Sequence, residues 1–231
     1  MEQYTLEPEL RWGSSTKIGV YTEISSGKKI AVKETSREEA SIFPRLNHPN
    51  IVKCIRSYEQ NGKPYVVMDY MERGDLKKFM GSNTITEPQI AKVMYSLLSA
   101  VAYIHEMNIV HKDIKPENVM MDADDSAKLC DFGISEQLES QDSFSKKIGG
   151  TSGYLSPDLA LMGRYNTKAD IWSLGIVLYE MCFHQLPFKN YAQAMRGTFE
   201  PFPEKSNKTF CRMVTLMLQK DPNTRPTARE L

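Results

Sequence analysis

Hydrophobic and polar positions alternate along much of the first 70 residues, which is the pattern of half-buried strands. Strands are predicted at residues 17–24, 29–34, 52–59 and 65–70. Asn61-Gly62 lies between the last two and is a strong hairpin signal. Residues 36–46 have helical character, with Ser36 as a candidate N-cap. This region is therefore predicted to be a small sheet with one short helix.

After Gly74 the apolar positions change to helical spacing. Apolar side chains recur about every 3.6 residues through residues 87–107, which predicts a long helix. Further helices are predicted at residues 169–183 and 209–219. A small strand-rich part followed by a larger helix-rich part predicts two lobes joined by residues 69–75, and a boundary between lobes is a common place for a ligand.

The composition fits a soluble globular chain. Of the 231 residues, 41% are hydrophobic, and 29 basic side chains balance 29 acidic ones. This balance steers the chain neither to nucleic acid nor to an anionic membrane. The most apolar stretch, residues 171–182, is too short to span a bilayer and predicts a buried helix. The four cysteines form no C-x-x-C pair and the N-terminus has no apolar signal, which predicts reduced thiols and a cytoplasmic or nuclear location.

Candidate chemistry lies in two short motifs. The sequence HKDIKPEN occupies residues 111–118, and Asp-Phe-Gly follows at 131–133. Phosphoryl transfer needs a carboxylate that orients the attacking hydroxyl, oxygen ligands for Mg²⁺ and a cation near the transferred group. These residue types, in this order and spacing, resemble the catalytic loop and metal-binding triplet of eukaryotic-type serine/threonine protein kinases. A lone Asp-Phe-Gly would mean little, but the pair of motifs is specific.

The resemblance implies a role for each polar residue of these motifs. Asp113 would be the catalytic base, and Asn118 and Asp131 would bind Mg²⁺. Lys115 would be the cation near the transferred phosphate, and Thr151, in a Gly-Thr pair, would complete the catalytic group. Lys115 and Thr151 are also typical of serine/threonine specificity. ATP and Mg²⁺ are the implied cofactors.

Lys33 resembles the strand lysine that holds the α- and β-phosphates of ATP. Counting back from the sequence NHPNIV at 47–52 assigns its glutamate partner to Glu39. Two alternatives stay open: Glu39 could form a capping box with Ser36, or Glu38 could be the partner. Only six positions separate Lys33 from Glu39, fewer than the family usually has, yet six residues can still bridge roughly 10 Å.

The implied adenine pocket is read from position in the chain. Met68 corresponds to the gatekeeper, the backbone of Asp69 and Met71 would pair with adenine, and Asp75 would bind ribose. The ring would lie between Ile18, Ala31 and Met120. For each apolar residue, plain core packing is the alternative.

The glycine-rich loop that covers the phosphates departs from the family pattern. Of its three glycines only the middle one survives, as Gly13, while Arg11 and Thr16 stand at the other two positions. Side chains there are expected to stiffen or lift the loop, because glycine allows backbone amides to approach phosphate.

The implied fold is α+β and bilobal: a small antiparallel β-sheet N-lobe with one short helix, and a larger, mainly α-helical C-lobe. Residues 1–231 would form one protein kinase domain, with the N-lobe at 1–68, the hinge at 69–75 and the C-lobe at 76–231. A packed stack linking the lobes would consist of Phe43, Cys54, His111 and Phe132. Arg225 would pair with Asp158, although an aspartate is shorter than the usual glutamate and leaves a direct pair open.

The segment from 131 to 158 most resembles the NIMA-related (never-in-mitosis) kinases. Lys112 replaces the usual arginine that grips an activation-segment phosphate, and lysine lacks the bidentate fork of arginine. Phosphate control is therefore predicted to be weak or absent, or to depend partly on Lys147. Ser143 and Ser145 are, with Thr151, the hydroxyls of the segment, and an activating kinase or a regulatory partner stays open.

The implied function is transfer of the γ-phosphate of ATP to serine or threonine of protein substrates, with no nucleic-acid or membrane partner. The alternative is a pseudokinase, an ATP-binding or scaffold module without turnover. The altered glycine loop, Lys112 and the shortened helix favour the alternative. The intact residues Lys33, Asp113, Asn118 and Asp131 favour the enzyme.

Overall fold

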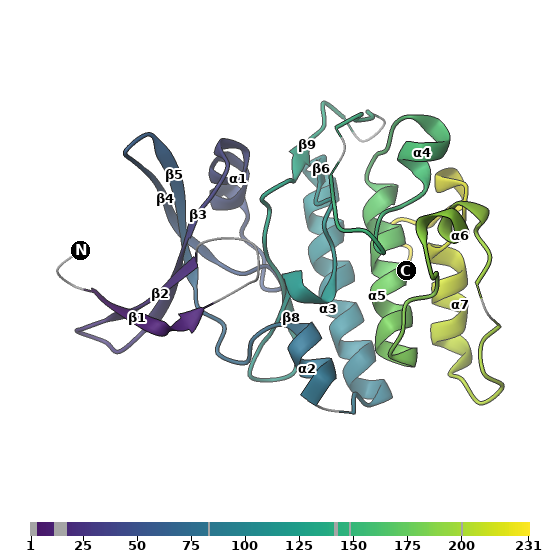
Figure 1. The fold of residues 1–231 in the computed structure, drawn as a ribbon, viewed down its shortest axis with the longest axis horizontal. Coiled ribbons are helices and arrows are strands. Elements are labelled where there is room, and N and C mark those ends of the chain that lie inside the picture. Colours follow the sequence, from purple (N-terminus) through teal and green to yellow (C-terminus); the bar gives the residue numbers. More distant parts are fainter. Residues whose placement is uncertain (1–3, 12–17, 83, 141–142, 148, 200) are drawn as a thin grey trace.

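The computed structural model describes residues 4–11, 18–82, 84–140, 143–147, 149–199 and 201–231. A strand-rich part and a helix-rich part lie side by side (Figure 1). The α+β fold class with a small antiparallel sheet and a larger helical part is thus confirmed.

The sheet has five antiparallel strands in the order β1-β2-β3-β5-β4. Their bounds are β1 Tyr4–Arg11, β2 Ile18–Glu23, β3 Lys29–Glu34, β4 Cys54–Gln60 and β5 Lys63–Asp69. Asn61 and Gly62 join β4 to β5 with positive φ angles of 52° and 75°, as a tight hairpin turn requires. The alternating pattern did not predict β1, whose Pro8 is tolerated because β1 is an edge strand.

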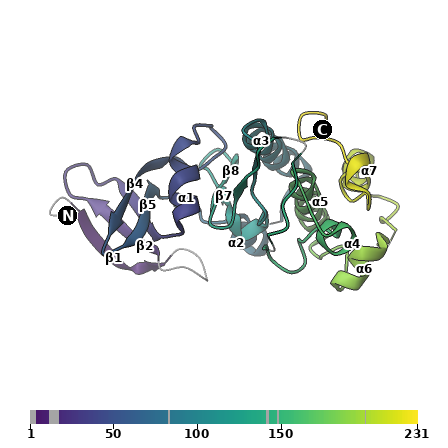
Figure 2. The same ribbon diagram turned by 90° about the horizontal axis from the view of Figure 1, so that it is seen from above.

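The helix of the sheet region is shorter than the sequence pattern predicted. α1 covers Arg37–Ile42 and continues as a 3₁₀ turn, η1, at Phe43–Arg45. Pro44 explains the change, because proline lacks the amide that an α-helix needs and clashes with the preceding turn. α1 lies between the sheet and the helical part, as two views at right angles show (Figures 1 and 2).

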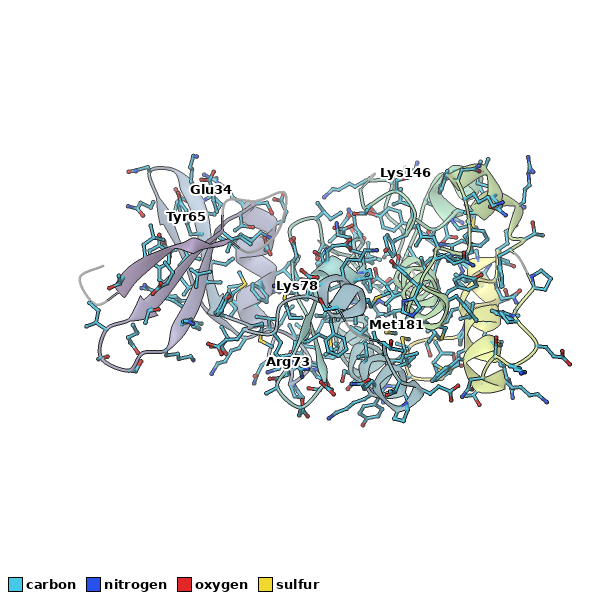
Figure 3. All side chains as sticks on the ribbon, turned by 60° about the horizontal axis from the view of Figure 1, so that its bottom comes forward. Glu34, Tyr65, Arg73, Lys78, Lys146 and Met181 are labelled. Atoms are coloured by element: carbon cyan, nitrogen blue, oxygen red, sulfur yellow. The ribbon has the colours of Figure 1, made fainter. Side chains whose placement is uncertain are left out.

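The helical part contains three longer helices: α3 Glu87–Glu106, α5 Lys168–Phe183 and α7 Lys208–Met217. α5 is buried along most of its length, as its apolar sequence predicted, and Met181 on it lies among the packed side chains (Figure 3). A Cβ at Gly175 would lie 2.8 Å from the Cβ of Met217. Glycine at this position therefore permits the close approach of α5 and α7.

The remaining elements are short. The helices are α2 Leu76–Ser82, α4 Asp158–Met162, α6 Tyr191–Arg196, and the 3₁₀ turns η2 Pro116–Asn118 and η3 Pro222–Thr224. Two antiparallel pairs join β6 Ile109–Val110 to β9 Glu136–Gln137 and β7 Val119–Met121 to β8 Ala127–Leu129. Strands of two or three residues are too short to show a period, so the hydrophobic pattern did not predict them.

One hydrophobic cluster runs through both parts, from Ala31 and Phe43 at the sheet to Trp172 and Met217 in the helical part. The two parts therefore share a core. Within the described ranges, none of the helices is both long enough and apolar enough to cross a bilayer.

Candidate active site

The two short strand pairs bring the sequence motifs together. β7 begins directly after Asn118, and β8 ends two residues before Asp131. The Cys130 amide donates a hydrogen bond to the Asn118 carbonyl at 3.0 Å, which fixes the two motifs side by side. Lys112 and Asp131 both have positive φ angles, of 73° and 62°. Such backbone conformations are rare outside glycine and concentrate at functional sites.

Lys33 connects the sheet to the helical part. Its Nζ lies 2.6 Å from Glu39 Oε2 and 2.7 Å from Asp131 Oδ1, and the residue is only 3% exposed. Burial disfavours the charged amine, but the negative charges of Glu39 and Asp131 outweigh it and raise the pKa of Lys33. The lysine is therefore a buried cation held between an acid from each part of the molecule.

Glu39 is the carboxylate that contacts Lys33, whereas Glu38 is exposed. The Glu39 carboxylate also accepts hydrogen bonds from the Phe132 amide at 3.0 Å and from the Thr35 hydroxyl. Ser36 does cap the helix, since its Oγ accepts from the Glu39 amide at 3.1 Å. The cap and the ion pair thus coexist: the backbone of Glu39 meets Ser36, and its side chain meets Lys33.

Asp113 is surrounded by three other residues that the motifs singled out. The Thr151 hydroxyl donates to Asp113 Oδ1 at 2.6 Å, and Lys115 Nζ lies 2.9 Å from Asp113 Oδ2 and 2.6 Å from Thr151 Oγ1. Asn118 Nδ2 donates to Asp113 Oδ2 at 3.0 Å and to the Asp113 carbonyl at 2.8 Å. The structure therefore forms one polar cluster around Asp113.

Asp170, buried at the start of α5, anchors the loop that carries Asp113. Its carboxylate accepts hydrogen bonds from the His111 and Lys112 amides, both at 2.9 Å, and lies 2.9 Å from His105 Nε2. Burial acts to raise the pKa of Asp170, but the hydrogen bonds, first that from His105, lower it. Sequence reasoning missed His105, which lies in an ordinary last helical turn and carries no motif signal.

Aromatic rings pack together across the boundary between the parts, Phe43 stacked on Phe132 and His111 edge to face with it. The Phe132 ring lies 5.4 Å from that of Phe43 and 4.8 Å from that of His111. His111 Nε2 lies 3.0 Å from the Cys130 carbonyl, and His111 Nδ1 accepts from the Asp113 amide at 3.3 Å, so the proton of the neutral ring belongs on Nε2. Cys54 packs against the same core.

The residues expected around adenine lie mainly in the core. Ala31, Met68, Met71 and Met120 are buried, and Ile18 is partly buried. Ala31 faces Met68 across β3 and β5, and Met120 forms a bridge with Asp75. The Asp69 carboxylate pairs with Lys28 at 2.8 Å. Gly13 and Thr16 lie outside the described residues, and Arg11 is the last residue of β1.

Two buried contacts hold the segment that follows Thr151. Arg225 donates to both oxygens of Asp158, at 2.5 and 2.8 Å, so the pair that the shorter aspartate left open is direct and bidentate. The Tyr154 hydroxyl donates to Glu180 Oε2 at 2.5 Å, and Lys77 Nζ lies 2.5 Å from Glu180 Oε1. The segment is thus fastened to α5 and to the C-terminal residues.

Comparison with known proteins identifies related chains. A family model described as the protein kinase domain matches residues 14–231. Mouse serine/threonine-protein kinase Nek1 is 31% identical over all of this chain and 21% of the relative, and mouse Nek3 is 33% identical over all of this chain and 49% of the relative. Human Nek5 is 33% identical over 94% of this chain and 32% of the relative. The chain spans between about a fifth and a half of the length of these relatives.

Proposed function

This chain belongs to the protein kinase family, and from that premise we propose that it transfers the γ-phosphate of ATP to serine or threonine hydroxyls of protein substrates. The observation that carries the proposal is the contact of Lys33 with both Glu39 and Asp131. It joins the sheet to the acidic loop of the helical part at the place where a nucleotide triphosphate needs a cation. The similarity to Nek1, Nek3 and Nek5 agrees with a NIMA-related kinase.

The donor atoms at this place fit Mg²⁺, which prefers carboxylate and amide oxygens. Asn118 uses its Nδ2 for both hydrogen bonds to Asp113. Among the described residues its Oδ1 accepts no hydrogen bond and is left for a cation. Asp131 offers Oδ2 beside the Oδ1 atom that contacts Lys33. Asn118 and Asp131 would hold the ion, which when bound neutralises charge on the phosphates.

The surrounding residues fit ATP. Lys33 would neutralise the α- and β-phosphates, and the buried side chains of Ala31, Met68 and Met120 would contact the adenine ring. Met71 is buried, and in the part of the chain that the structure describes its amide donates no hydrogen bond. That amide is therefore suited to donate to an adenine nitrogen. Gly13 is proposed to contact the phosphates and Asp75 the ribose.

Asp113 would accept the proton of the attacking hydroxyl. In the structure its Oδ1 already accepts a hydrogen bond from an aliphatic hydroxyl, that of Thr151. A substrate serine or threonine carries the same group, so Asp113 is able to orient it. Lys115 Nζ lies against Asp113 and would balance negative charge on the transferred phosphoryl group.

The same proposal includes the lobe boundaries, the cellular compartment and the binding partners. β5 ends at Asp69 and α2 begins at Leu76, which supports a hinge at 69–75 between lobes at 1–68 and 76–231. The four cysteines are free thiols, which supports a reducing compartment, the cytoplasm or the nucleus. Protein substrates are the proposed partners, and an activating kinase or a regulatory partner stays open. The contacts of Lys33 with Glu39 and Asp131 support the enzyme over the pseudokinase, although Lys112 and the short α1 differ from the family pattern.

Lys33→Met is expected to reduce phosphate transfer by about 100- to 1000-fold, because methionine keeps the length of the side chain but removes the cation. The measurement is transfer of labelled γ-phosphate from ATP to casein in the presence of Mg²⁺, which the parent is expected to perform. The matched control is Lys53→Met, at an exposed position of the same lobe, which is expected to leave the rate unchanged. Chelation of the divalent cation is expected to stop transfer by the parent. Transfer that persists in Lys33→Met, or a parent that transfers nothing, would contradict the proposal.

A further inference from the structure

Four side chains converge on one carboxylate, that of Glu136 in β9. Lys112 Nζ lies 3.3 Å from Glu136 Oε2, and the Ser145 hydroxyl donates to the same oxygen at 2.7 Å. The Tyr165 hydroxyl oxygen lies 3.3 Å from Glu136 Oε2, and Lys147 Nζ lies 3.7 Å from Glu136 Oε1. Neither catalysis nor nucleotide binding, as described above, accounts for this cluster.

Three of the four partners of Glu136 belong to two different segments. Lys112 directly precedes Asp113, and its amide is fixed by Asp170. Ser145 and Lys147 lie on the segment that leads to Thr151, the residue whose hydroxyl contacts Asp113. Glu136 therefore fastens this segment to the catalytic loop through contacts separate from the one that Thr151 makes with Asp113.

Tyr165 reinforces the attachment of the segment. Its backbone exchanges two hydrogen bonds of 2.9 Å with Ser145, and its hydroxyl donates to the Lys147 carbonyl at 2.8 Å. Lys112 Nζ also lies 5.5 Å from the centre of the Tyr165 ring. Lys146, between the two anchored residues, is exposed and lies at the edge of the molecule (Figure 3). Ser145 and Lys147 are thus held in place, while Lys146 between them points to solvent.

The charges explain why an acid is needed at this position. The Lys112 side chain is 7% exposed, and a buried cation is costly without a counter-ion. Burial acts to raise the pKa of Glu136, but the Ser145 hydroxyl and the two lysines lower it, so the carboxylate is ionised near neutral pH. Glu136 provides within the chain the negative charge that a phosphate on the segment would otherwise bring to Lys112.

We infer that Glu136 is a positioning residue that holds residues 145–147, and through them residues 149–151, against the Asp113 loop, so that the productive arrangement needs no phosphate on this segment. The inference rests on the proposed kinase function for its effect on rate, and on the contacts alone for its effect on structure. It also assigns a consequence to Ser145: a phosphate there would replace a hydrogen-bond donor to Glu136 by a second anion. Such a modification loosens the segment.

The test compares Glu136→Gln with Glu139→Gln, a matched control at an exposed position three residues further along. Amide hydrogen exchange of residues 145–147, 149–151 and Tyr165 reports the positioning whether or not the protein is active. We expect exchange about tenfold faster or more in Glu136→Gln, because a hydrogen-bonded charged pair is lost, and no change in Glu139→Gln. Equal exchange in Glu136→Gln and the parent overturns the inference.

The rate separates positioning from general destabilisation. Glu136→Gln is expected to lower kcat for peptide phosphorylation about tenfold or more while the KM for ATP stays near that of the parent, and Glu136→Asp is expected to restore part of kcat. A fall in kcat in Glu139→Gln of the same size, or no fall in Glu136→Gln, overturns the inference. A parent without any transfer contradicts the proposed function instead, and the exchange experiment then decides the positioning role.

Phosphate dependence gives a second, independent measurement. Parent protein treated with a phosphatase is expected to keep its activity, whereas a loss of about tenfold or more would show that a phosphate is required and overturn the inference. Ser145→Asp is expected to lose more activity than Ser145→Ala, because only the former brings a second carboxylate toward Glu136. Higher activity in Ser145→Asp than in the parent overturns the inference as well.

Discussion

Asp113→Asn is expected to reduce phosphate transfer by about 10²- to 10⁴-fold, the range that a positioned general base contributes. Asparagine has nearly the same shape, and its amide oxygen still accepts a hydrogen bond, so the cluster with Thr151 and Asn118 keeps part of its geometry. It lacks the basicity to take a proton and the charge that holds Lys115 at 2.9 Å. The loss therefore belongs to kcat, measured with labelled ATP and a saturating peptide.

A control of the same chemistry separates this loss from a loss of fold. Asp124→Asn makes the same substitution at an exposed turn, where the side chain contacts Lys92, and is expected to leave kcat unchanged. The unfolding midpoints of both variants are measured beside the rates. If Asp113→Asn keeps a kcat within a few-fold of the parent, with less than about 1 kcal/mol of barrier lost, Asp113 is not the base.

The long helices were predicted because they have enough turns to show a period, whereas the eight-residue strand β1 was missed. Residues 87–107 and 169–183 both extend over several turns, and the structure places α3 and α5 there within one residue at each end. β6 and β9 have two residues each and cannot show a period. Their pairing comes from the loops that they close, which is a tertiary effect. The hydrophobic pattern therefore predicts the main sheet and the long helices, but not the two- and three-residue strands that bring the motifs together.

In the candidate site too, residues close together in the sequence could be predicted, whereas contacts between distant residues could not. Asp113, Lys115 and Asn118 lie within six consecutive residues, so a local loop conformation suffices to bring them together. Glu39 could not be separated from a helix cap by sequence, since its backbone does serve the cap while its side chain reaches Lys33. Glu136 was missed altogether.

The reason that Glu136 was missed is physical. A glutamate three residues after Gly133 carries no local signal, and its partners Ser145 and Tyr165 lie 9 and 29 residues away. The sequence singled out Lys112, Ser145 and Lys147, but the need of Lys112 for a counter-ion follows only from its burial in the fold. The sequence offers 29 acidic side chains for that role, and only the fold selects among them.

The Arg225–Asp158 pair tests, through the stability of the protein, the argument that a buried charge requires a counter-ion. Both side chains are almost fully buried, and the guanidinium also donates to the carbonyls of Gln219, Lys168 and Lys220. These neutral acceptors satisfy the donors of Arg225 but do not balance its charge. Removal of the carboxylate alone therefore leaves an uncompensated buried cation over the Trp172 ring.

Asp158→Ala is expected to lower the free energy of unfolding by about 3–5 kcal/mol, the cost of breaking a buried ion pair from one side. The control is Glu106→Gln, which breaks the exposed pair with Arg229 and is expected to cost about 1 kcal/mol or less. Urea unfolding of the purified protein measures both. The double variant Asp158→Ala with Arg225→Met is expected to be more stable than Asp158→Ala alone, because the unpaired charge is then absent. If Asp158→Ala costs no more than Glu106→Gln, the pair does not hold the segment, and its attachment to the helical part depends on Tyr154 and Glu180 instead.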